Sequence, residues 1–114
     1  MPDAHANLFV NETDFAAKVE QSPIPVLVDF YADWCAPCRM IAPSIAELAT
    51  EFEGRARVLK VNVEENPALA ARFNIRSIPM LMIFKGGQPV QQIMGAVPKE
   101  SLAQALEEHL AGAA

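Results

Sequence analysis

The sequence predicts an α/β domain in which helices pack on a mixed β-sheet. Four apolar runs rich in β-branched and aromatic residues are typical of strands, at residues 26–31, 58–63, 80–84 and 90–94. Helical patterns lie between them, so the order of elements is strand, helix, strand, helix, strand, strand, helix. This order predicts parallel pairing across the helical crossovers and an antiparallel hairpin through Gly86 and Gly87.

The helices follow from apolar residues that recur at three- and four-residue steps. The longest helix follows the first of these strands and has its apolar face at Ile41, Ile45, Leu48, Ala49 and Phe52. A short helix is expected over residues 68–73, with Asn66 as N-cap and Pro67 in its first turn. A last helix begins near Pro98 and stacks Leu102, Leu106 and Leu110 on one face, leaving Glu107 and Glu108 to water. An earlier helix is expected near Thr13, with Phe15 and Val19 toward the core, after a short strand over residues 8–10.

Composition sets the class of molecule. The 114 residues are 52% hydrophobic, which is enough for a core. Neither a repeat nor a linker divides the sequence, so we expect one domain over residues 1–114, with residues 1–6 as a flexible N-terminus. The net charge of −5 argues against nucleic acid or an anionic membrane as partner. With neither a secretory signal nor a membrane-spanning run in the sequence, we expect a cytoplasmic location.

Two cysteines carry the candidate chemistry. Cys35 and Cys38, in the segment WCAPC, fall where the strand over residues 26–31 leads into the longest helix. The N-terminus of a helix stabilises a thiolate, the reactive form of cysteine, so Cys35 is the expected nucleophile. Cys38, three residues on, lies within disulfide reach and is the expected resolving thiol. Pro37 fits the first turn and stiffens the loop between the sulfurs.

Two other interpretations of the pair remain open. A structural disulfide would close a ring too small to remove much chain entropy, about 2 kcal/mol. Zinc needs about four ligands, whereas the chain offers two cysteines and the distant His5 and His109, so only a metal-bridged dimer would complete a site. Arg39 adds positive charge near the cysteines, and a solvated surface residue is an equally good interpretation of it.

The chain resembles the thioredoxin family from about residue 9 to residue 110. The matching segments, in order along the chain, are VDF at 28–30, WCAPC at 34–38, MIAP at 40–43, KVN at 60–62, IRSIP at 75–79, FKGG at 84–87 and GA at 95–96. The resemblance implies a three-layer thioredoxin fold, with a central mixed five-stranded sheet flanked by four helices. It also implies a protein-disulfide reductase whose redox-active Cys35–Cys38 disulfide receives electrons from NADPH through a flavin-containing thioredoxin reductase. We expect no metal or bound cofactor, and we expect a monomer because one small domain that docks its partners transiently does not require a permanent partner.

Asp29 stands in an otherwise apolar run, which predicts a buried carboxyl with a raised pKa. The resemblance gives it the role of accepting the proton of Cys38, and gives Lys60 the role of tuning it. It also implies a cis peptide bond before Pro79, against the low base rate of such bonds, and pairing of the Ile78 backbone with an extended substrate.

The resemblance further implies an apolar patch around Cys35 at which partners dock, which we call the docking surface. Its expected members are Trp34, Ala36, Ile78, Gly95 and Ala96.

Some positions depart from the common family pattern. Ala36 replaces a glycine and Arg39 a lysine, and Tyr31 stands where a second tryptophan is frequent. Met80 replaces a threonine and is expected to bring a larger side chain close to the sulfurs. Two other functions are therefore weighed, a disulfide isomerase or oxidase of the same fold, and a non-catalytic binding subunit.

Overall fold

The computed structural model describes residues 8–111, and its centre is a mixed β-sheet in the strand order β2-β1-β3-β4. The strands are β1 (Val26–Tyr31), β2 (Arg57–Asn62), β3 (Met80–Lys85) and β4 (Gln88–Met94). β1 pairs with β2 in parallel and with β3 in antiparallel orientation, and β4 is antiparallel to β3. The predicted mixed sheet and its hairpin are confirmed.

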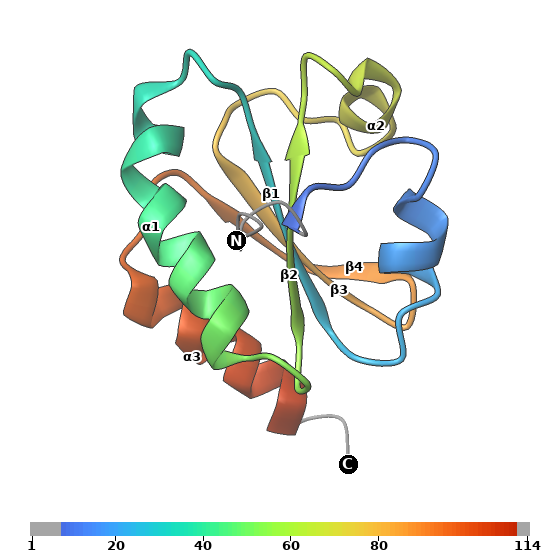
Figure 1. Cartoon of the computed structure of the whole chain (residues 1–114), viewed down its shortest axis with the longest axis vertical. Helices are drawn as coiled ribbons and strands as arrows, with labels where there is room; N and C mark the ends of the chain where they lie inside the picture. The colour runs from blue at the N-terminus through green and yellow to red at the C-terminus, as the bar shows by residue number, and fades with distance from the viewer. Residues whose placement is uncertain (1–7, 112–114) are drawn as a thin grey trace, which may run out of the picture.

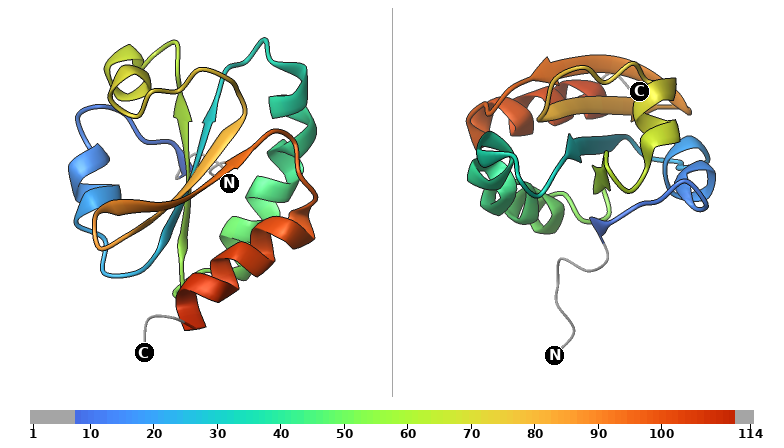
Figure 2. Two further views of the ribbon diagram at one scale, coloured as in Figure 1. Left: turned by 180° about the vertical axis from the view of Figure 1, so that it is seen from behind. Right: turned by 90° about the horizontal axis from the view of Figure 1, so that it is seen from above.

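Helices cover both faces of the sheet, which gives three layers. α1 (Ala36–Glu51) and α3 (Lys99–Ala111) lie on one face, whereas the π-helix η2 (Ala16–Glu20) and α2 (Pro67–Arg72) lie on the other (Figures 1 and 2). None of the helices in residues 8–111 has the length and apolar character needed to cross a membrane.

Period-two alternation divides the core between the two layers. All six residues of β1 are buried. Val28 packs in the cluster beneath η2 and α2, while Leu27 packs in the cluster beneath α1 and α3. The first cluster includes aromatic rings in edge contact, Phe15 against Phe84 with centroids 5.8 Å apart. Because both faces of β1 are covered, its sequence is a continuous apolar run broken only by Asp29.

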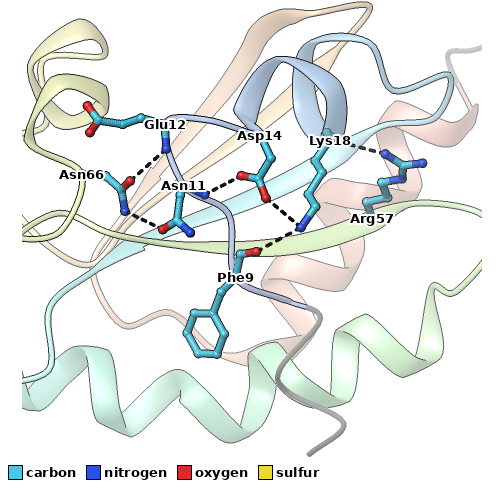
Figure 3. A network of polar contacts seen from close by, with 7 residues as sticks. All are labelled: Phe9, Asn11, Glu12, Asp14, Lys18, Arg57 and Asn66. Atoms are coloured by element: carbon cyan, nitrogen blue, oxygen red, sulfur yellow. Dashed lines mark hydrogen bonds and ion pairs between the residues drawn. The ribbon is translucent and has the colours of Figure 1, made fainter.

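The fifth strand expected over residues 8–10 is not formed in the described part of the chain, where the sheet has four strands. That segment makes a single parallel bridge between Phe9 and Lys60, in which the Val10 N–H donates to the Lys60 carbonyl at 2.9 Å. Polar contacts then hold the turn that follows this bridge. The Asn11 N–H donates to the Asp14 carboxylate at 2.7 Å, and Asp14 pairs with Lys18 at 3.0 Å (Figure 3). The segment expected to be flexible, residues 1–6, lies outside the described residues.

Asn66 holds the N-cap position of α2 but makes no side-chain cap there, contrary to its expected role. Its buried side chain instead accepts a hydrogen bond from the Glu12 N–H at 2.9 Å (Figure 3). It also donates to the Asn62 carbonyl at 3.1 Å. The Glu12 carboxylate accepts from the Ala68 N–H at 3.1 Å, so a neighbouring segment satisfies a free N–H of the helix. Asn66 therefore joins the N-terminal segment to α2.

The turn between β3 and β4 provides a stability prediction. Gly86 and Gly87 both have positive φ, at 62° and 82°. A Cβ at Gly87 would lie 2.9 Å from the carbonyl oxygen of Glu20, whereas a Cβ at Gly86 would meet nothing within 4 Å. We expect Gly86→Ala to lower the free energy of unfolding by about 1 kcal/mol and Gly87→Ala by about 2–3 kcal/mol. Urea denaturation of both variants measures this, and equal losses would contradict the predicted clash.

Candidate active site

The two cysteines form a disulfide at the N-terminus of α1, at the upper end of the molecule in Figure 1. Their Cα atoms lie 5.2 Å apart, and each residue is only 4% exposed. Cys35 is the N-cap of α1, and its Sγ accepts a hydrogen bond from the Cys38 N–H at 3.3 Å. This donor and the positive end of the helix dipole stabilise negative charge on Cys35 more than on Cys38. Pro37 lies in the first turn of the helix, where it leaves no hydrogen bond unmade.

A second segment meets the disulfide from the loop before β3. The carbonyl oxygen of Ile78 lies 3.8 Å from Cys35 Sγ, and the Ile78–Pro79 peptide bond is cis, the form that the resemblance implies. The carbonyl of Pro79 accepts a hydrogen bond from the Gly95 N–H at 3.0 Å, which joins the end of β4 to the same place. Cys35 therefore contacts the Ile78–Pro79 segment, which in turn contacts the end of β4.

Asp29 is completely buried in the middle of β1, and within residues 8–111 neither carboxylate oxygen has a hydrogen-bond partner. Burial raises the pKa of this carboxyl to about 7. The positive charge of Lys60 has the opposite effect and lowers the pKa, but by less. Lys60 is the residue paired with Asp29 on β2. Its Nζ lies 4.5 Å from the centre of the Tyr31 ring, a cation–π contact that positions the lysine head.

A hollow of about 270 Å³ connects Lys60 with Cys38. Its walls are formed by Tyr31, Ala32, Asp33, Cys38, Arg39, Ala42 and Lys60. Asp29, which is completely buried, is not among the lining residues. Arg39 closes one side by donating from Nη1 to the Asp33 carbonyl at 2.8 Å, so it braces the loop before the cysteines.

The residues of the docking surface differ in exposure. Trp34 is 65% exposed and Ala36 and Ala96 are exposed, whereas Ile78 and Gly95 are half-buried. Met80 is not beside the sulfurs, contrary to expectation: it is 6% exposed and packs in the cluster beneath η2 and α2. Met80 is the first residue of strand β3, and the alternation of side chains along that strand directs it into this layer.

The structure adds features that the sequence analysis missed. A hollow of about 310 Å³ extends from Trp34 and Ile78 toward α2, and its other walls are Val63, Pro67, Ala70, Ile75, Arg76 and Ser77. Met94, 64% exposed, places its Sδ 3.8 Å from Ser77 Oγ. The adjacency of Met94 to Gly95 was the one sequence signal that pointed to it.

A redox disulfide at a helix N-terminus, beside a cis-proline and above a buried carboxyl with a raised pKa, defines a thiol–disulfide oxidoreductase. The thioredoxin family model matches residues 6–108. Over 101 residues, which are 89% of this chain and 94% of each relative, the sequence is 55% identical to thioredoxin 1 of Nostoc sp. and 52% identical to the thioredoxin of Synechocystis sp.. It is also 52% identical to the thioredoxin of Staphylococcus aureus, covering 95% of that protein. The chain belongs to the thioredoxin family, and its activity is the reduction of protein disulfides by dithiol–disulfide exchange.

Proposed function

We propose that Cys35 attacks the disulfide of an oxidised protein and that Cys38 completes the reaction. The observation that carries this assignment is the position of Cys35 as N-cap of α1, with the Cys38 N–H 3.3 Å from its sulfur. The Cys35 thiolate forms a bond to one substrate sulfur, and the other substrate sulfur leaves as a thiolate that takes up a proton. The Cys38 thiolate then attacks Cys35 in the mixed disulfide, which releases the reduced substrate and closes the Cys35–Cys38 bond.

Asp29 accepts the proton that Cys38 must lose in the second step. A carboxyl with a pKa of about 7 is divided between its two protonation states near neutral pH, which suits a group that takes up and returns a proton. Lys60 opposes the effect of burial, and so keeps the pKa of Asp29 from rising further. The hollow shared by Lys60 and Cys38 supports this arrangement, with proton transfer passing over a short distance or through water.

Protein substrates dock around Cys35. The half-buried Ile78 presents its backbone beside the sulfur, where an extended segment of the substrate would form main-chain hydrogen bonds. Trp34, Ala36, Gly95 and Ala96 supply the surrounding surface. An apolar surface of this kind, exposed beside a reactive sulfur, suits contacts that form and break within one turnover.

The oxidised pair is returned to the dithiol by a flavin-containing thioredoxin reductase that takes electrons from NADPH. Family membership supports this supply, together with a monomeric protein that works in the cytoplasm. The acidic surface, with a net charge of −5, is compatible with protein partners and unfavourable for nucleic acid or anionic membranes.

Insulin reduction, driven by NADPH and a bacterial thioredoxin reductase, tests the proposal. The wild-type chain is expected to precipitate the insulin B chain and consume NADPH, and a variant with both Cys35→Ser and Cys38→Ser is expected to do neither, because no sulfur is left to exchange. A double variant that reduces insulin at the wild-type rate would show that the two cysteines do not carry the reaction. A wild-type chain that does not reduce insulin would overturn the enzymatic role and leave that of a binding subunit.

A further inference from the structure

Met94 is an exposed methionine whose neighbour in sequence, Gly95, is linked to the active site. The next residue, Gly95, donates its N–H to the Pro79 carbonyl at 3.0 Å, and the residue before that proline places its carbonyl 3.8 Å from Cys35 Sγ. The side chain of Met94 is 64% exposed, so its thioether is open to small oxidants in solvent.

A hydroxyl group lies against this thioether. Ser77 Oγ is 3.8 Å from Met94 Sδ, in hydrogen-bonding geometry for a sulfur acceptor. A thioether is a weak acceptor, whereas the oxygen of a sulfoxide is a strong one. The hydroxyl therefore stabilises the oxidised form of Met94 more than the reduced form. Negative charge grows on the peroxide oxygens as the S–O bond forms, so the same hydroxyl, turned toward them, also stabilises the transition state of oxidation.

The other methionines in residues 8–111 provide a comparison. Met80 and Met82 are buried, at 6% and 1% exposure. Met40 is more exposed than Met94, at 74%, but its Sδ accepts no hydrogen bond from any of the described residues. Exposure alone therefore predicts faster oxidation of Met40, and the contact with Ser77 predicts a preference for Met94.

We infer that Met94 is a peroxide-sensitive modification site, and that its conversion to the sulfoxide weakens the docking of protein substrates. The sulfur attacks one oxygen of hydrogen peroxide, so that an S–O bond forms while the O–O bond breaks. The departing hydroxide takes the proton of the transferred oxygen and leaves as water. Methionine loses two electrons and peroxide gains them. The docking effect rests on the proposed function, because it requires that substrates contact the surface beside Cys35.

The effect on activity follows from the change in polarity. Methionine is flexible and apolar, which suits a surface that accepts many partners, whereas the sulfoxide is polar and keeps its water. Losing part of one apolar side-chain contact lowers the rate constant for a protein disulfide by about fivefold. A small disulfide that reaches Cys35 without covering Met94 should react at an unchanged rate.

The test treats the full chain with hydrogen peroxide while the Cys35–Cys38 disulfide is closed, so that the cysteines are protected. Peptide mapping then measures the sulfoxide at Met94 and at Met40. We expect Met94 to be oxidised at least as fast as Met40, and Ser77→Ala to lower the ratio of Met94 to Met40 sulfoxide by about twofold. Slower oxidation of Met94 than of Met40, or a ratio unaffected by Ser77→Ala, would overturn the modification site.

The second readout compares rates before and after peroxide, once the disulfide has been reduced. For the wild type and for Met40→Leu, we expect a loss of about fivefold with insulin and none with 5,5′-dithiobis(2-nitrobenzoic acid). Met94→Leu should keep its own untreated rate with both. An equal loss in Met94→Leu, or no loss in the wild type, would overturn the docking effect. If the untreated wild type fails to reduce insulin, it is the proposed function that fails, and the peptide map still decides whether Met94 is the modified residue.

Discussion

A Cys38→Ser variant is expected to become covalently attached to its first protein substrate, whereas a Cys35→Ser variant is expected not to react. Cys35 is the N-cap of α1, where a thiolate is stabilised, while Cys38 lies one turn inside the helix and has the proposed resolving role. Turnover should fall by at least about 10³-fold in both variants, because each lacks one half of a two-step exchange.

Mass spectrometry of each variant after incubation with oxidised insulin distinguishes the two roles. The Cys38→Ser protein should gain the mass of one insulin chain, and a thiol reductant should remove it. The Cys35→Ser protein serves as the matched control, because it retains one cysteine at 4% exposure, the same as in the other variant. Adduct formation through Cys38 in the Cys35→Ser protein, with none in the Cys38→Ser protein, would reverse the assignment.

Asp29→Asn is expected to abolish a fall in stability between about pH 4 and pH 7. Burial raises the pKa of Asp29 from 3.8 to about 7. Below about pH 4 the carboxyl is protonated in both the folded and the unfolded state and has no effect. As the pH rises to about 7, the unfolded chain loses its proton first, so the free energy of unfolding falls by up to about 4 kcal/mol and then stays constant.

The measurement is urea denaturation of the wild type and the variant from pH 4 to pH 8. The readout is the slope with pH, because the buried amide of the variant also changes the absolute stability. Lys60→Met is a second variant that keeps the Asp29 carboxyl but removes the positive charge beside it. Without the lysine charge the pKa of Asp29 should rise, and the fall in stability should extend to higher pH. A slope in Asp29→Asn equal to that of the wild type would show that another group is responsible.

Catalysis offers a further readout of the same substitution. Stopped-flow kinetics separate the attack of Cys35 from the attack of Cys38, and Asp29→Asn should slow the second step by about 10²-fold while leaving the first nearly unchanged. An unchanged second step would remove Asp29 from the mechanism.

Local patterns in the sequence were sufficient for much of the fold. Strand β1 was predicted over the same residues that the structure shows, because a strand covered on both faces is a continuous apolar run, and Pro25 marks where this one begins. The place of Cys35 and Cys38 at the start of α1 was also predictable, since it required only the end of one strand and the periodicity of the next helix.

Features that depend on distant contacts were not predictable in this way. The side chain of Asn66 is used by Glu12, 54 residues away, so a local cap motif was misleading. The face on which Met80 packs depends on where β3 begins, and a shift of one residue would have turned it toward the other layer. The hollow between Trp34 and α2 and the contact of Ser77 with Met94 arise only when separate loops meet.

The reduction potential of the Cys35–Cys38 pair tests the central claim most directly. The pair can be equilibrated against a thiol redox buffer, with the fluorescence of Trp34, the single tryptophan of the chain, as readout. Each 30 mV corresponds to about 1.4 kcal/mol in the stability of the disulfide relative to the dithiol. A potential well below that of the glutathione couple is the result expected for a protein-disulfide reductant. A potential well above it would contradict this account and favour an oxidase or isomerase.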